Sequence, residues 1–170
     1  MPDRQTHPPS TTVGSGAPRI WALLSHRTGD NGQVLALAEA LGLPFTEKRL
    51  RTNKRRLLPT AWIRPGLRRL DRASRELLGA PWPDLLILCG QRYVPVARWV
   101  RAQSGGRTRI VVIGRPRCPP AWVDLILTTP NYGVPAAPNV LCLPMPLSRM
   151  TAARLAEAAT RDPGGVAGFP

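Results

Sequence analysis

Short strand-like runs alternate along the chain with stretches of helical spacing. Strands are predicted over residues 20–25, 45–50, 84–89, 110–113, 124–128 and 140–143. One predicted helix spans residues 34–41, with Val34, Leu37, Ala38 and Leu41 on one face and Gly42 ending it. A second runs through Val96, Trp99 and Val100, and a last one covers residues 151–160 with Thr151 as its cap.

Largely apolar strands separated by helices define the fold class. Strands of this kind are buried on both faces, as in sheets whose crossovers are helices. The sequence therefore predicts an α/β, Rossmann-like three-layer domain with a mainly parallel sheet over residues 19–160. Residues 1–18, rich in Pro, Ser, Thr and Gly, are predicted to be a disordered leader, and residues 161–170 a tail.

The loop at residues 25–33 is the strongest indication of a ligand. It lies between the first strand and the first helix, and Asp30 followed by Gln33 imitates a capping box whose free amides suit an anion or a sugar hydroxyl. Ligands of such sheets gather at the carboxyl ends of the strands, where residues 90–92 and 114–117 also lie. The predicted ligand-binding residues are Thr28, Gly29, Asp30, Asn31, Gln33, Gly90, Gln91, Arg92 and Arg115. Ordinary tight turns with solvated arginines remain the alternative.

Several catalytic and cofactor classes find no support. The dinucleotide fingerprint GxGxxG and the phosphate loop GxxxxGK[ST] are absent after the first strand. His26 is the only histidine in the predicted domain, and caps and turns explain Asp30, Asp84 and Asp124, so no catalytic residue is named. No cofactor and no metal site are predicted, because Cys89, Cys118 and Cys142 are far apart. They are expected to be free thiols, with Cys89 and Cys142 packing as small hydrophobes.

The net charge of +14 favours an anionic partner, although an arginine-rich coding bias explains part of it, since only Lys48 and Lys54 are lysines. Residues 47–76 hold eleven basic and three acidic side chains. There, Leu67, Leu70, Leu77 and Leu78 are predicted to face inward, beside Trp62, Ile63 and an exposed Trp82. A membrane or partner surface is predicted at Arg55, Arg56, Arg64, Arg68, Arg72 and Arg75.

A solvated helix face is an equal alternative for that basic segment, and nucleic acid is an unlikely partner because no recognition motif is present. The chain lacks a secretory signal and an apolar stretch of the ~18 residues that span a membrane. We therefore expect a cytoplasmic protein, with peripheral contact to the inner membrane face as a further option.

Several motifs together resemble a known family. Residues 25–33 with the following Leu-Ala-Glu-Ala-Leu-Gly helix, Pro83-Asp84-Leu85-Leu86-Ile87, Cys89-Gly90-Gln91-Arg92 and residues 138–141 are similar to bacterial relatives of the plant mitochondrial fission "elongated mitochondria" family. That family resembles GT-B glycosyltransferases, in which the N-terminal of two Rossmann-like domains receives the acceptor and the C-terminal one holds the nucleotide-sugar.

The resemblance implies a glycosyltransferase-like, acceptor-binding domain, with a lipid-linked acceptor as one option. The family continues into a second Rossmann-like half, so we expect a chain truncated before the nucleotide-sugar domain and inactive by itself. A non-catalytic interaction or membrane-surface module is the alternative, its partner being another protein or the missing C-terminal domain.

Overall fold

A parallel sheet forms the centre of the molecule. The computed structural model describes residues 16–25, 28–53 and 64–150 and positions 154, 156, 157 and 160. Within these residues, six strands pair in the order β2-β1-β3-β4-β5-β6, and every pair is parallel. Their bounds are β1 (Ile20–Leu24), β2 (Phe45–Arg49), β3 (Leu85–Cys89), β4 (Arg109–Ile113), β5 (Leu125–Thr128) and β6 (Val140–Cys142). The predicted fold class and all six predicted strands are confirmed.

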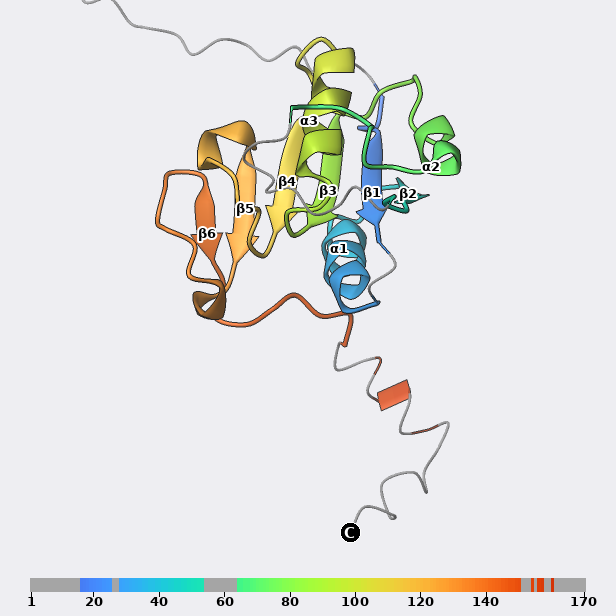
Figure 1. Ribbon diagram of the computed structural model, residues 1–170. Coiled ribbons are helices and arrows are strands. Elements are labelled where there is room, and N and C mark those ends of the chain that lie inside the picture. The colour runs from blue at the N-terminus through green and yellow to red at the C-terminus, as the bar shows by residue number, and fades with distance from the viewer. Residues whose placement is uncertain are drawn as a thin grey trace, which may run out of the picture.

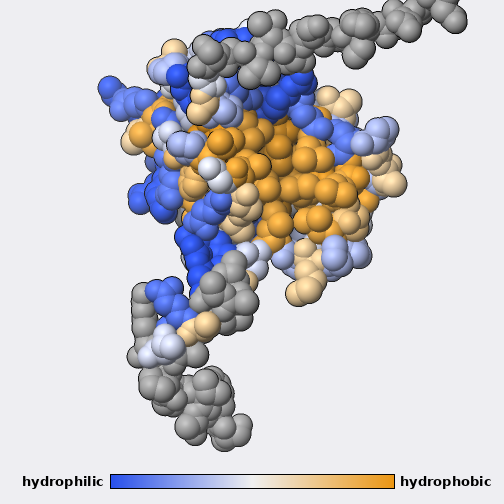
Figure 2. Space-filling view, turned by 180° about the vertical axis from the view of Figure 1, so that it is seen from behind, coloured by the Kyte–Doolittle hydropathy of each residue, from blue (hydrophilic) through white to orange (hydrophobic). Residues whose placement is uncertain are grey.

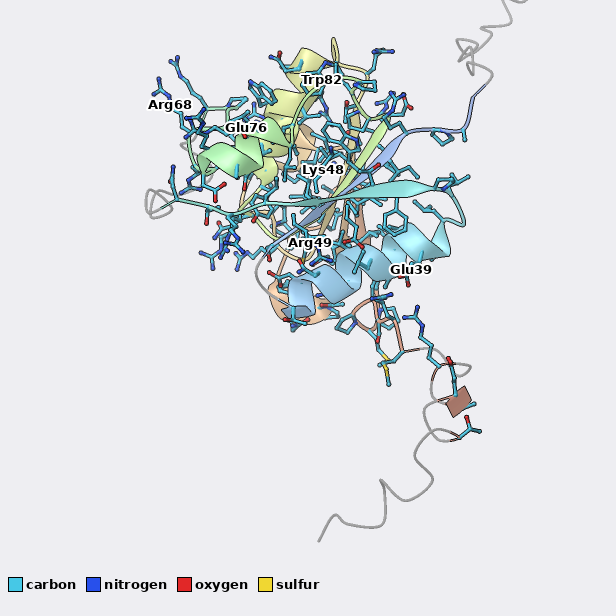
Figure 3. The ribbon with its side chains drawn as sticks, turned by 90° about the vertical axis from the view of Figure 1, so that its right-hand side faces the viewer. Glu39, Lys48, Arg49, Arg68, Glu76 and Trp82 are labelled. Atoms are coloured by element: carbon cyan, nitrogen blue, oxygen red, sulfur yellow. The ribbon has the colours of Figure 1, made fainter. Side chains whose placement is uncertain are left out.

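Helices lie on both faces of this sheet. Side chains alternate between the two faces along each strand, so each strand contributes to a core cluster on either side. Ile20 and Ala22 of β1 belong to one core cluster with Val34 and Ala38 of α1 (Thr28–Ala40). The neighbouring β1 residues point the other way, into the cluster that contains α3 (Val94–Gln103). In Figure 1, α3 lies in front of β3 and β4, and Figure 3 shows α1 on the other side of the sheet. The molecule is a three-layer α/β domain.

The start of the first helix differs from the prediction. Residues 25–33 were expected to form a loop, but α1 begins at Thr28, so Asp30 and Gln33 lie inside the helix and form no capping box. Two glycines made this stretch resemble a loop. Leu41, predicted on the inward face, is 41% exposed beyond the end of α1, whereas Gly42 does end the helix with a φ of 65°.

The basic segment contains only one short helix in its described part. This helix, α2 (Arg72–Glu76), is capped by Asp71, whose carboxylate accepts a hydrogen bond from the Ser74 amide at 2.8 Å. Of the residues predicted to face inward, Leu70 and Leu78 are buried and Leu67 is half-buried, but Leu77 is 44% exposed. A long amphipathic helix is therefore absent from the described residues.

The predicted exposure of Trp82 is wrong. Its ring is half-buried and lies 6.1 Å from the ring centre of Trp21 and 5.6 Å from that of Trp99. The ammonium group of Lys48 lies over the ring of Trp21, 4.6 Å from its centre. Trp82 thus joins β1 to α3 as a packing residue and is not available as a membrane anchor.

Among the described residues, the sheet face opposite α3 is covered by α1, which packs mainly on β1 and β3. Figure 2, seen from behind the view of Figure 1, shows a broad apolar area on this side. Leu143 and Leu147 pack against its core cluster after β6. Beyond them, Arg149 and Arg154 form ion pairs with Glu39 of α1, which fasten the chain after β6 to that helix.

The cysteines are free thiols, as predicted. Cys89 and Cys118 are half-buried, but Cys142 is exposed and so does not pack as a small hydrophobe, because its side chain extends from the edge strand β6. The described residues include no helix with the length and apolar character needed to cross a membrane.

Some predictions fall partly or wholly outside the described residues. His26, Arg55, Arg56, Trp62, Ile63, the cap residue Thr151, the tail at residues 161–170 and most of the leader are among them. Of the last predicted helix, the four described positions, Arg154, Ala156, Glu157 and Thr160, are helical.

Candidate functional site

The strand order reverses between β1 and β3, and we call the carboxyl end of these two strands the crevice, after the usual ligand position in open α/β sheets. The chain passes from β1 outward to β2, returns to β3 on the other side of β1, and continues outward to β6. In open α/β sheets, ligands bind outside the carboxyl ends of the two strands where the order reverses. Here those strands end at Leu24 and Cys89, so Ser25, the first turn of α1 and residues 90–92 flank the same crevice.

Asn31 closes the turn between β1 and α1. Its side-chain oxygen accepts a hydrogen bond from the Ser25 amide at 2.7 Å, and its side-chain nitrogen donates to the Ser25 carbonyl at 2.8 Å. Both backbone groups of Ser25 are thereby satisfied at the point where the strand ends. Asn31, predicted as a ligand contact, is held by the protein itself and shapes the crevice wall.

Asp30 connects the two sides of the crevice. The Cys89 thiol at the end of β3 is hydrogen-bonded to the Asp30 carboxylate from α1. Burial, together with the Asp30 charge and this hydrogen bond, raises the pKa of Cys89 to about 12. Cys89 therefore stays a neutral thiol at physiological pH and is not a nucleophile, because the thiolate is the reactive form.

Tyr93 joins the start of α3 to the segment that follows β2. It is 1% exposed at the N-cap of α3, and its hydroxyl donates to the Leu50 carbonyl at 2.5 Å. Burial raises the pKa of Tyr93 to about 12, with Asp71 and Asp30 contributing in the same direction and Arg92 opposing them. The charges of Asp30 and Arg92 thus both act on this buried hydroxyl.

Arg69 is a residue that the sequence reasoning missed. It is 9% exposed, and its pKa is lowered by burial and by the neighbouring charge of Arg92. The chain holds it there through a bridge between Thr52 and Leu70 and through a hydrogen bond of 2.7 Å from the Asn53 amide to the Arg69 carbonyl. Two guanidinium groups from segments far apart in the sequence therefore lie near the end of β3.

The remaining predicted residues are distributed around this edge. Thr28 and Gly29 are exposed in the first turn of α1, and Gly90, Gln91 and Arg92 are half-buried beyond β3. Gly90 has a φ of 69°, a conformation that favours glycine, and its amide donates to the Ile113 carbonyl at 2.7 Å.

Two predicted residues lie beside other cavities. Gln33 lines a narrow cavity of about 10 Å³ with Thr129 and Tyr132, a space for about one water molecule. Arg115 lines a separate groove beyond β4.

The crevice combines charges suited to a polar, anionic ligand. Arginine recognises phosphate or carboxylate through paired hydrogen bonds, and an anion between Arg69 and Arg92 relieves their mutual repulsion. Asp30 presents a carboxylate that can accept hydrogen bonds from hydroxyl groups. The protein is thus an open α/β sheet whose strand reversal, the usual ligand position in such sheets, is flanked by segments that carry Asp30 and Arg92.

The family follows from comparison with known protein families. The family model described as Mitochondrial fission ELM1 matches residues 28–166, which is most of the chain. The protein therefore belongs to the mitochondrial fission ELM1 family, as the motifs in the sequence indicate. No curated protein and no solved structure matches the chain.

Proposed function

We propose that this chain is a glycosyltransferase-like acceptor domain whose crevice between β1 and β3 binds an acceptor that carries an anionic group. The observation that carries the proposal is the strand reversal at β1 and β3, the usual ligand position in such sheets, with Asp30 and Arg92 on the segments that follow these two strands and the charge of Arg92 acting on the buried Arg69. The likeness of the family to GT-B glycosyltransferases supports the same assignment.

The roles divide according to charge. Arg92 and Arg69 hold the anionic group of the acceptor, and Asp30 accepts a hydrogen bond from a hydroxyl beside it. Asn31 and Tyr93 keep the two walls in position through their hydrogen bonds to Ser25 and Leu50. In a GT-B arrangement the nucleotide-sugar lies on a second Rossmann-like domain, so the described residues account for acceptor binding and not for sugar transfer.

Calorimetric titration of the full chain tests this proposal. Glucose 1-phosphate is expected to bind more tightly than either glucose or inorganic phosphate, because it engages both the arginines and Asp30. Arg92→Ala is expected to weaken binding about tenfold or more, the usual cost of losing a charged hydrogen-bond partner. Arg107→Ala is the matched control. It removes the same charge from an exposed residue before β4, at the amino ends of the strands and therefore away from the crevice.

Two results would contradict the acceptor role. Equal weakening by Arg92→Ala and Arg107→Ala would mean that net charge, and not the crevice, binds the sugar phosphate. A nucleotide-sugar that binds more tightly than any sugar phosphate, and competes with it, would assign the donor role to this crevice.

A second candidate function is attachment to an anionic membrane surface or to an acidic partner. The observation that favours it is the exposure of Arg64, Arg68, Arg72 and Arg75 within one segment. Figure 3 shows Arg68 extending outward from this surface, and Arg72 forms an exposed ion pair with Glu76. Each basic residue beside anionic lipid contributes about 1 kcal/mol.

Vesicle flotation separates this candidate from the first one. Attachment predicts recovery with phosphatidylglycerol-containing vesicles and none with pure phosphatidylcholine vesicles. The double variant Arg64→Ser/Arg68→Ser is expected to lower recovery, with Arg107→Ser/Arg109→Ser as a control of equal charge. Equal recovery with both types of vesicle would contradict electrostatic attachment.

A further inference from the structure

A second concave site lies beyond the carboxyl end of β4. It is a groove of about 400 Å³ between the segment that follows β4 and the connection from β5 to β6. Its volume is within the range of ligand sites, ~300–1,000 Å³. It shares no lining residue with Asp30, Arg69 and Arg92, and the inference from it does not depend on the proposed function.

The walls of the groove are apolar. Ile126, fully buried in β5, lies on the floor, and Val134 and Cys118 are half-buried at the sides. Pro116, Pro119, Pro120 and Pro135 complete the lining. Proline rings fix the backbone and have no amide hydrogen, so these walls are stiff and offer few hydrogen-bond donors. Such walls favour an apolar chain over a polar ligand.

Two cationic side chains line this apolar space. Arg115 and Arg117 line it, both are exposed, and neither forms an ion pair or hydrogen bond within the described part of the chain. Arg117 has a φ of 49°, a conformation that is uncommon outside glycine. Arg98 lies 3.7 Å from the ring centre of Trp122, and its charge also acts on the Cys118 thiol.

Acidic side chains are missing from the described lining of the groove. The nearest acidic residue along the chain, Asp124, directly precedes β5. It forms ion pairs with Arg101 and Arg109 at the amino ends of the strands, away from the carboxyl end of β4. An apolar groove with positive charge at its rim matches a ligand of opposite charge and similar shape. That ligand has one hydrocarbon chain and one anionic head.

We propose that this groove is a binding site for a single-chain anionic amphiphile, whose hydrocarbon chain lies on Ile126, Val134 and the prolines and whose head is held by Arg115 and Arg117. Two sources share this chemistry, an alkyl phosphate and a fatty acid. Either head accepts paired hydrogen bonds from a guanidinium group. The apolar chain gives most of the affinity, and the two arginines fix its direction.

Calorimetric titration of the full chain with monomeric ligands, below the concentrations at which they aggregate, tests the proposal. The probes are decyl phosphate, decanoate, decanol and inorganic phosphate, with octyl phosphate to measure the effect of chain length. Each buried methylene is expected to tighten binding about fourfold, so decyl phosphate is expected to exceed octyl phosphate by about tenfold or more. Inorganic phosphate and decanol are each expected to bind at least tenfold more weakly than decyl phosphate.

Three variants locate the site. Arg115→Ala removes one exposed head contact and is expected to weaken decyl phosphate about tenfold without changing the melting temperature. Val134→Phe fills the groove and is expected to reduce the difference between octyl and decyl phosphate. Arg107→Ala makes the same charge change as Arg115→Ala, but at the amino end of β4 and not beyond its carboxyl end. It is expected to leave binding unchanged.

The outcomes are distinct. Tighter binding of decyl phosphate than of decanoate assigns a phosphate head, the reverse assigns a carboxylate, and either result supports the site. Inorganic phosphate binding as tightly as decyl phosphate would overturn it, because no chain would then be recognised. Equal weakening by Arg115→Ala and Arg107→Ala, or no binding of any amphiphile, would also overturn it.

Discussion

Replacing Tyr93 by Phe tests the support beneath the crevice. The ring stays and only the hydroxyl is lost, so the change removes the 2.5 Å hydrogen bond to the Leu50 carbonyl without creating a large cavity. Tyr93 and Leu50 are each 1% exposed, and the Leu50 carbonyl loses this donor in a site that is closed to water. An unsatisfied buried acceptor costs about 1–3 kcal/mol, and each kcal/mol lowers the melting temperature by about 2–4 °C in a chain of this size.

The same substitution changes the dependence of stability on alkaline pH. Burial keeps Tyr93 protonated in the folded state up to a pKa of about 12, whereas in the unfolded state it ionises near 10.0. Between these two values the unfolded state loses its proton first, so the free energy of unfolding falls as the pH rises. Two pKa units correspond to about 2.7 kcal/mol, and Tyr93→Phe removes this contribution.

Urea unfolding followed by tryptophan fluorescence at pH 7, 10, 11 and 12 measures both effects. Tyr132→Phe is the matched control, because Tyr132 is the other tyrosine of the chain and its hydroxyl makes no hydrogen bond to a described residue. A Tyr93→Phe variant as stable as the Tyr132→Phe variant at pH 7, with the same loss of stability above pH 10, would refute the role assigned to the buried hydroxyl.

Three further substitutions give expected outcomes. Asn31→Ala loses both hydrogen bonds to Ser25 and is expected to lower the free energy of unfolding by about 2 kcal/mol in urea titration. An unchanged free energy of unfolding would contradict the role of these two hydrogen bonds. Trp82→Leu breaks two aromatic contacts, and calorimetry is expected to show a loss of about 1–3 kcal/mol. The Asp71 carboxylate has a pKa lowered from 3.8 by its hydrogen bonds with Ser74, so part of the wild-type stability is lost as the pH falls below 3.8. In Asp71→Asn, acid titration is expected to show a smaller loss, and an unchanged acid profile would contradict this.

The strands were predictable from the sequence, because their patterns are local. Runs such as Leu85–Cys89 are apolar throughout, as strands covered on both faces must be. The start of α1 was harder to predict, since Gly29 and Gly32 are typical of loops and the tertiary contacts of Val34 and Ala38 outweigh that local preference.

The candidate site was predictable only in part. The loops after β1 and β3 follow from the position of strand ends, and so do Asp30 and Arg92. Arg69 does not, because its approach to Arg92 depends on how the segment after β2 folds back, through the bridge between Thr52 and Leu70. The packing of Trp82 against Trp21 and Trp99 likewise joins distant segments whose sequence shows no periodic pattern.

The central claim is that the crevice between β1 and β3 binds an anionic acceptor. Titration of the ¹⁵N-labelled chain with glucose 1-phosphate, followed by amide chemical shifts, tests it most directly. The account predicts saturable shifts at Ser25, Asp30 and residues 90–92, no comparable shifts at Arg107 and Arg109, and loss of the response in Arg92→Ala. Shifts spread evenly over the arginine-rich surface, or no saturable shift at residues 90–92, would contradict it.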